Sequence, residues 1–108
     1  MQGIKTFIPT NQKIIYLQSL LNCDFDTLDF GSFVSPKAIP QMSDTAAVLA
    51  GLDLGNTPTK ILSIVAHLRG AEAAWSHDEI TYLGYPFSIS ENFQMRNTHT
   101  TITEAITV

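Results

Sequence analysis

The sequence predicts an α/β protein built on a parallel sheet. Amphipathic helices and short apolar strands alternate along its 108 residues in the order helix, strand, helix, strand, helix, strand, which is typical of parallel α/β folds. The segment 60–66, Lys-Ile-Leu-Ser-Ile-Val-Ala, is almost continuously apolar, as strands covered on both faces tend to be. No internal repeat or low-complexity linker interrupts the pattern, so residues 1–108 are expected to form a single unit.

The first helix is expected over Gln12–Asn22, with Thr10 or Asn11 as its N-cap. Its apolar stripe has helical spacing and consists of Ile14, Leu17 and Leu21, widened by Ile15 and Leu20. Its polar face consists of Gln12, Lys13, Gln18 and Ser19. The following strand, Thr27–Gly31, is short and ends at a glycine.

The segment 32–42 holds two prolines and is expected to be a loop that cannot be helical throughout. Ser43 or Asp44 then caps a second helix that ends near Leu52. The packing residues of this helix are expected to be Ala46, Ala47, Val48 and Leu49. A turn at 55–59 leads into the apolar strand.

The third helix is predicted over Gly70–Trp75, with Trp75 as a packing residue, and the third strand over Glu79–Phe87. Near the C-terminus, Thr101 and Glu104 have the spacing of a capping box, which announces a helix. Only four residues follow Glu104, too few for a stable isolated helix. No strand precedes the first helix either, so the chain is expected to be truncated at both ends.

Composition narrows the function classes. The chain is 44% hydrophobic and 15% charged, as globular proteins are. Its net charge of -4 does not favour binding to nucleic acid or to an anionic membrane. No apolar run approaches the roughly 18 residues of a membrane span. The single cysteine, Cys23, excludes an internal disulfide and fits a reducing compartment, which predicts a cytoplasmic protein.

Three stretches together resemble the hydroxymethylglutaryl-CoA lyase family of metal-dependent (β/α)₈ barrels. They are Ser32–Met42, with its Ser-Phe-Val-Ser-Pro-Lys sequence, Leu68–Ala74 and Ser88–Asn97, similar to the family's segments after its second, third and fourth strands. The resemblance implies a partial TIM (β/α)₈ barrel of about three βα units, and therefore a single incomplete domain over residues 1–108.

The resemblance also implies a reaction. The family splits 3-hydroxy-3-methylglutaryl-CoA into acetyl-CoA and acetoacetate by a retro-Claisen cleavage, assisted by a divalent metal, magnesium or manganese. An acyl-CoA substrate and a homodimeric full-length protein follow from the same resemblance. Catalytic groups in such barrels lie at the C-terminal ends of the strands.

Six residues match positions of the family's site. The catalytic positions are Gln2, which matches the last residue of the family's Arg-Asp-x-x-Gln signature, Asp29, where the family usually has Glu, and Ser32. The substrate-binding positions are His67, where the family more often has Asn, with Ser88 and Ser90. Considered without the resemblance, Asp29 is a structural carboxylate and Ser32 a turn residue.

No metal is expected to bind this chain by itself. The family's metal-binding Asp and His-x-His pair have no counterpart here, and His67, His77 and His99 lack that spacing. The chain alone is therefore predicted to be inactive and, as an unclosed barrel, aggregation-prone or oligomeric. Two alternatives stand beside the lyase: an acyl-CoA condensing synthase of the same superfamily, or a non-catalytic truncated half-barrel.

Overall fold

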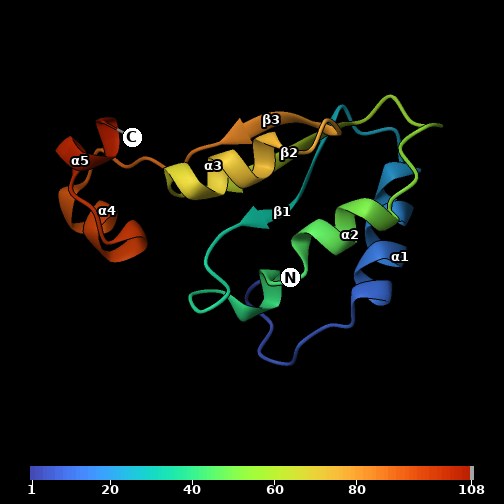
Figure 1. Ribbon diagram of the computed structural model, residues 1–108, viewed down its shortest axis with the longest axis horizontal. Helices are drawn as coiled ribbons and strands as arrows, with labels where there is room; N and C mark the ends of the chain where they lie inside the picture. The colour runs from blue at the N-terminus through green and yellow to red at the C-terminus, as the bar shows by residue number, and fades with distance from the viewer. Residues whose placement is uncertain (108) are drawn as a thin grey trace.

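The computed structural model describes residues 1–107 and contains one sheet of three parallel strands in the order β1–β2–β3 (Figure 1). The strands are β1 (Thr27–Phe33), β2 (Lys60–Val65) and β3 (Ile80–Gly84). The helices are α1 (Thr10–Leu21), α2 (Thr45–Gly51), α3 (Leu68–Trp75), α4 (Glu91–Thr98) and α5 (Ile102–Ile106), with a short 3₁₀ helix η1 (Pro40–Met42). The predicted parallel α/β arrangement is confirmed.

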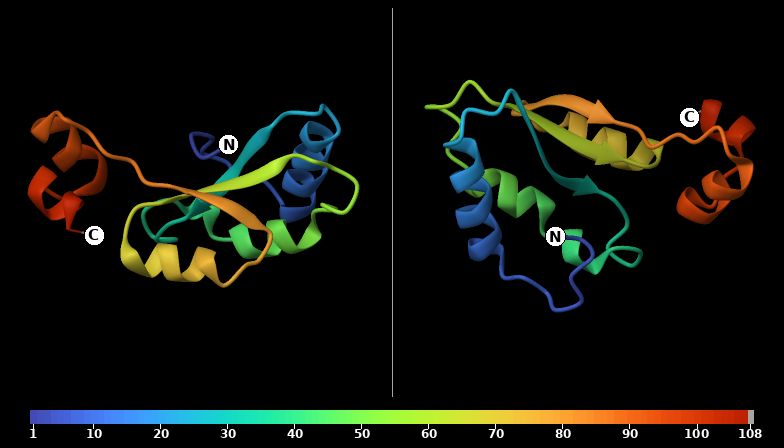
Figure 2. Two further views of the ribbon diagram at one scale, coloured as in Figure 1. Left: turned by 90° about the horizontal axis from the view of Figure 1, so that it is seen from above. Right: turned by 180° about the vertical axis from the view of Figure 1, so that it is seen from behind.

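One face of the sheet carries the core. Helices α1 and α2 pack beside β1, while α3 lies along β2 and β3 (Figure 2). The core residues are Leu17, Leu21, Leu28, Phe30, Val48, Leu49, Leu52 and Ile61. The opposite face has no helical layer within residues 1–107, so Leu62 and Ile64 of β2 are only half-buried. The expectation that this strand is covered on both faces is therefore wrong for the described chain.

Several expected packing residues point to solvent. Leu17 and Leu21 of α1 and Val48 and Leu49 of α2 are buried as predicted. Ile15 is 67% exposed, and Ala46 and Ala47 are exposed as well. The reason is geometric, because each short helix has a neighbour on one side only and buries a single narrow stripe.

The N-termini of α1 and α2 are not capped as expected. Pro9 occupies the N-cap position of α1, and Asp44 occupies that of α2 without a side-chain capping bond. The Thr10 hydroxyl instead donates a 2.6 Å hydrogen bond to the Asp44 carboxylate. That carboxylate also pairs with Lys13, which is only 1% exposed although the sequence pattern placed it on the polar face. The Asp44 carboxylate therefore neutralises the buried Lys13 instead of capping α2.

Strand boundaries also differ from the prediction. β1 continues two residues into the segment expected to be a loop and ends at Phe33. β3 ends at Gly84 rather than at residue 87. The early end of β3 follows from Pro86, which has no N–H to donate to a ladder.

The C-terminal capping box is confirmed, and α5 forms despite its length. The Thr101 hydroxyl accepts from the Glu104 N–H, and the Glu104 carboxylate accepts from the Thr101 N–H. Tertiary bonds stabilise α5: the Ile102 N–H donates to the Glu91 carboxylate at 3.1 Å, and the Tyr85 hydroxyl donates to the Ala105 carbonyl at 3.2 Å. Figure 1 shows the α4–α5 pair beyond the end of β3.

None of the helices in residues 1–107 has the length and hydropathy that crossing a membrane would require.

Candidate functional site

A β-bulge in β1 brings two of the predicted catalytic residues onto one face. Asp29 pairs with Leu62 and Ser32 pairs with Ile64, so β1 places two residues between these pairs where β2 places one. In a regular strand, residues three apart point to opposite faces. The extra residue reverses the alternation, so that Asp29 and Ser32 both lie on the side of Leu62 and Ile64, opposite the helices.

Gln2 joins them from the N-terminal segment. A hollow of about 280 Å³ is lined by Gln2, Asp29 and Ser32. Its other lining residues are Met1, Phe30, Gly31, Met42 and Ile64. The three residues that the sequence assigned to catalysis therefore share one surface, although 27 positions separate the first from the second.

The Asp29 carboxyl has the chemistry of a proton acceptor. Desolvation raises its pKa above the ordinary value, and this outweighs the opposing effects of the Gly31 backbone N–H and the nearby N-terminal ammonium of Met1. A carboxylate with a raised pKa holds a proton more tightly than a solvated one does. Asp29 is nonetheless exposed on the sheet surface, so a ligand can reach it.

Ser32 is positioned by its backbone. The residue is 5% exposed, and its carbonyl accepts a 2.9 Å hydrogen bond from the Thr45 hydroxyl. The same hydroxyl lies 2.7 Å from the Met42 carbonyl, so the two carbonyls share its single proton, and this ties the end of β1 to the start of α2. The Ser32 backbone is therefore fixed within β1 and does not lie in a flexible turn.

His67 lies elsewhere and has a structural role. It is the N-cap of α3, where its Nδ1 accepts a 3.0 Å hydrogen bond from the Gly70 N–H. Capping satisfies one of the free N–H groups at a helix start, a role that Asn also performs well. A separate hollow of about 280 Å³ includes His67, Ser35 and Arg69 in its lining, but not Asp29. The sequence pattern predicted no cap at this position, although a polar residue before Leu68 was a usable signal.

Ser88 and Ser90 organise the turn before α4. The Ser90 hydroxyl accepts from the Phe93 N–H at 3.3 Å as the N-cap of α4, and the Ser88 hydroxyl accepts from the Ser90 N–H at 3.0 Å. Neither residue lines the hollow that holds Asp29. The structure therefore brings together the three catalytic candidates and leaves the three substrate-binding candidates apart from them.

The described residues do not complete a metal site. Within residues 1–107, no group of three or more His, Cys, Asp or Glu side chains could hold a metal ion together. Around the hollow, Asp29 is the single carboxylate, accompanied by the amide of Gln2 and the hydroxyl of Ser32. One anionic oxygen ligand is a poor match for magnesium or manganese, which are bound through several oxygen ligands.

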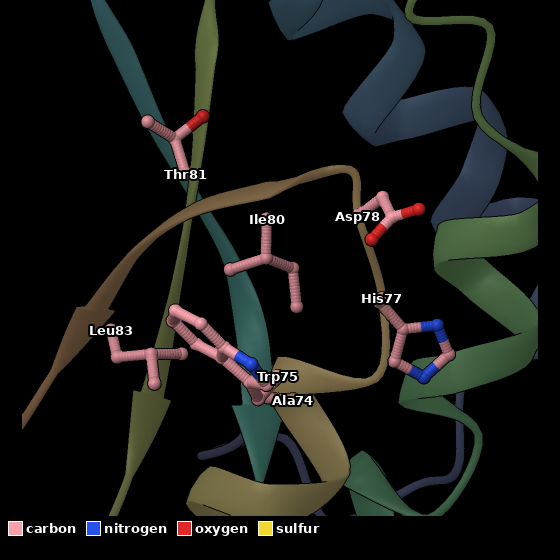
Figure 3. Close-up of a pocket in the computed structure, with 7 residues that line it drawn as sticks. All are labelled: Ala74, Trp75, His77, Asp78, Ile80, Thr81 and Leu83. Carbon is pink, nitrogen blue, oxygen red and sulfur yellow. The ribbon is translucent and has the colours of Figure 1, made fainter.

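A third hollow, of about 390 Å³, lies where α3 turns into β3 (Figure 3). His77 and Asp78 project from the turn, whereas Trp75, Ile80 and Leu83 gather on its other side. Trp75 is 81% exposed, so its expected role as a packing residue is wrong within this chain. None of the predicted site residues lines this hollow.

Two curated relatives match nearly the whole chain. A mitochondrial hydroxymethylglutaryl-CoA lyase from Arabidopsis thaliana is 31% identical over 110 residues, which cover 98% of this chain and 22% of the relative. A Pseudomonas aeruginosa protein, named as a lyase of 3-hydroxy-3-isohexenylglutaryl-CoA and hydroxymethylglutaryl-CoA, is 31% identical over 106 residues, covering 98% and 35%. The chain is homologous to one part of the hydroxymethylglutaryl-CoA lyases. No protein-family model matches it.

Solved hydroxymethylglutaryl-CoA lyase structures have the same fold over the matched part. The lyase from Brucella melitensis superposes with a TM-score of 0.90 at 33% identity, covering 98% of this chain and 37% of that one. A lyase from Acinetobacter baumannii, solved with coenzyme A and 3-methylmalate, gives a TM-score of 0.90 at 28% identity, covering 98% and 34%. The expected partial TIM barrel is confirmed, and the chain spans between 22% and 37% of these hydroxymethylglutaryl-CoA lyases.

Proposed function

We propose that this chain is the part of a hydroxymethylglutaryl-CoA lyase that supplies Gln2, Asp29 and Ser32 to the active site. The reaction is the cleavage of 3-hydroxy-3-methylglutaryl-CoA into acetyl-CoA and acetoacetate. The observation that carries the proposal is the shared hollow, in which a bulge and a distant N-terminal segment bring three family-matched positions together. Residues 1–108 act as a single, incomplete domain.

In the proposed reaction Asp29 accepts the proton of the substrate's tertiary hydroxyl. The carbon–carbon bond then breaks, the former hydroxyl oxygen becomes the ketone of acetoacetate, and the bond's electrons form the enolate of acetyl-CoA, which is then protonated. Gln2 and Ser32 donate hydrogen bonds to substrate oxygens, where donors held in place stabilise developing charge. The raised pKa of Asp29 supports its role, because a general base works best when its pKa is near the working pH.

The family resemblance implies a divalent metal, magnesium or manganese, that acts as a Lewis acid. The residues of this chain do not fit such an ion. We therefore propose that the 108-residue chain alone binds no metal at this site and does not turn over substrate. The protein in which these residues work is proposed to be a cytoplasmic homodimer that binds an acyl-CoA, whereas the isolated chain self-associates through its uncovered sheet face. Relatives carry both "mitochondrial" and "cytoplasmic" in their names.

A chimera tests the lyase proposal. The matching segment of the Brucella melitensis lyase is replaced by residues 1–108, and acetyl-CoA release is measured with added magnesium or manganese beside the isolated chain. The chimera is expected to cleave substrate and the isolated chain is not. Asp29→Asn in the chimera is expected to lower kcat by about 10² to 10⁴. A folded chimera with no cleavage, or one indifferent to Asp29→Asn, would contradict the proposal.

The incomplete set of metal ligands favours one alternative, a non-catalytic half-barrel. Sequencing the DNA on both sides of the reading frame distinguishes the two: an in-frame Arg-Asp before Met1 and a His-x-His strand after Val108 support the lyase. Stop codons on both sides support the half-barrel. The synthase alternative is tested on the protein with its natural flanks, by assaying condensation of acetyl-CoA with a 2-oxo acid in parallel with cleavage.

A further inference from the structure

The N-terminal segment that carries Gln2 has almost no structure of its own. Residues 1–9 belong to no helix or strand, residues 2–7 are exposed, and the one backbone hydrogen bond within residues 1–9 joins the Ile4 N–H to the Met1 carbonyl at 3.0 Å. An exposed segment of this kind is expected to be mobile unless tertiary contacts hold it. Yet its first two residues line the hollow with Asp29 and Ser32.

Gln41 provides those contacts. Its side chain accepts a 2.8 Å hydrogen bond from the Ile8 N–H and donates two of 2.9 Å, to the carbonyls of Ile4 and Thr6. Gln41 itself is 5% exposed, so these bonds are shielded from competing water. One amide thus satisfies three backbone groups on a segment that has no strand partner.

The other side of Gln41 is fixed to the sheet. The next residue, Met42, lines the hollow, and its carbonyl shares the Thr45 hydroxyl proton with the Ser32 carbonyl. The Gln41 carbonyl accepts from the buried Lys13 ammonium. A single dipeptide, Gln41-Met42, therefore connects the segment bearing Gln2 to the strand bearing Asp29 and Ser32.

We propose that Gln41 is a positioning residue, which clamps residues 4–8 so that Gln2 lies against Asp29 and Ser32. The inference rests on the proposed function, because positioning Gln2 matters only if Gln2 takes part in catalysis. The hydrogen bonds of Gln41 can be tested without an activity assay. Gln41 does not line the hollow that holds Asp29, and its side chain bonds only to the backbone of the segment. Substituting Gln41 leaves Gln2, Asp29 and Ser32 unchanged but releases Gln2 from its position beside the other two.

Gln94 is a matched control. It is 1% exposed, and its side chain likewise accepts a 2.8 Å hydrogen bond from a backbone N–H, that of Ser88. It also donates to the hydroxyls of Thr98 and Thr100, in the α4 region rather than near Asp29. Gln41→Met and Gln94→Met each remove a buried side-chain amide, from two different places in one chain.

The first measurement is amide hydrogen exchange on the 108-residue chain by NMR. In the unmodified chain the Ile8 N–H is expected to exchange more slowly than that of exposed Lys5. Gln41→Met should speed exchange at Ile8 about tenfold and leave Ser88 unchanged, whereas Gln94→Met should do the reverse. An Ile8 amide that exchanges as fast as Lys5 in the unmodified chain overturns the proposal, even if the variants do not fold.

The second measurement separates positioning from general stability. Burial raises the Asp29 pKa and the N-terminal ammonium of Met1 lowers it, and Met1 and Gln2 line the hollow beside Asp29, so releasing the segment should change the carboxyl NMR titration of Asp29. Gln41→Met and the isosteric Gln41→Glu, which loses both donors, are expected to shift this titration, and Gln94→Met is not. An unchanged titration in both Gln41 variants overturns the proposal. A chimera without lyase activity but with Ile8 protected would instead refute the proposed function and leave the clamp standing.

Discussion

The Lys13 ammonium and the Asp44 carboxylate form a 2.7 Å ion pair whose side chains are only 2% and 14% exposed. Lys13 comes from α1 and Asp44 precedes α2, so the pair joins the two helices that pack beside β1. The Lys13 ammonium also lies 4.3 Å from the centre of the Phe7 ring, and Thr10 donates a second hydrogen bond to Asp44. A buried charge of this kind is tolerated because each partner is neutralised and hydrogen-bonded.

Lys13→Met is therefore expected to destabilise the chain by about 3 kcal/mol, because it leaves the Asp44 carboxylate buried without its counter-ion. The free energy of unfolding from urea denaturation checks this. Lys60→Met provides the control: its pair with Asp26 is 3.4 Å long and exposed on both sides, and solvent screening leaves such pairs with little effect on the free energy of unfolding. Equal effects of the two substitutions would show that Lys13 does not carry a buried charge.

The Lys13–Asp44 pair also predicts a loss of stability in acid. Burial alone would raise the Asp44 pKa, but the hydrogen bonds from Lys13 and Thr10 and the charge of Lys13 outweigh it, and the pKa is lowered. A carboxyl with a lowered folded pKa stabilises the fold above its unfolded value of about 3.9, and this is lost as the pH falls through the folded pKa. Thermal melts from pH 6 to 2 should show a decline that is smaller in Asp44→Asn.

Asp29 should have the opposite pH dependence. Desolvation raises its folded pKa, so the folded state binds the proton more tightly than the unfolded chain does. Its contribution to stability therefore grows as the pH falls from neutral through the raised pKa, and levels off below the unfolded value of about 3.9. Comparing unmodified chain and Asp29→Asn in melts from pH 7 to 4 isolates this contribution. A stability difference between them that does not vary over that range would contradict the raised pKa.

Gly70→Ala tests the packing of α3 against β1. A Cβ at Gly70 would collide with the backbone carbonyl oxygen of Phe33, which cannot move without disturbing the strand. The expected cost is about 1 to 3 kcal/mol, as for other forced overpacking. Gly3→Ala is the control, because nothing lies within 4 Å of its Cβ position, and its effect should stay within about 0.5 kcal/mol. Circular dichroism melts of both variants decide whether the close approach at Gly70 is required.

The sequence by itself determined the order and type of the elements up to β3. Hydrophobic periodicity, prolines and capping residues act over a few positions, so they can be read locally. The Thr101–Glu104 capping box is such a signal, and it forms as predicted. The resemblance to the family similarly grouped Gln2, Asp29 and Ser32 as catalytic positions before their places in the fold were known.

Tertiary structure decided how these residues meet. The bulge that turns Asp29 and Ser32 to one face depends on pairing with β2, a partner about 30 residues away that leaves no mark in the local pattern. Lys13 looked like a solvated residue because its counter-ion Asp44 lies 31 positions along the chain. In the sequence Gln41 was only part of a loop motif, and its three long-range hydrogen bonds to the N-terminal segment appear only in the fold. Local patterns specify elements because their interactions are local, whereas buried polar groups are satisfied by whichever partners the fold brings near.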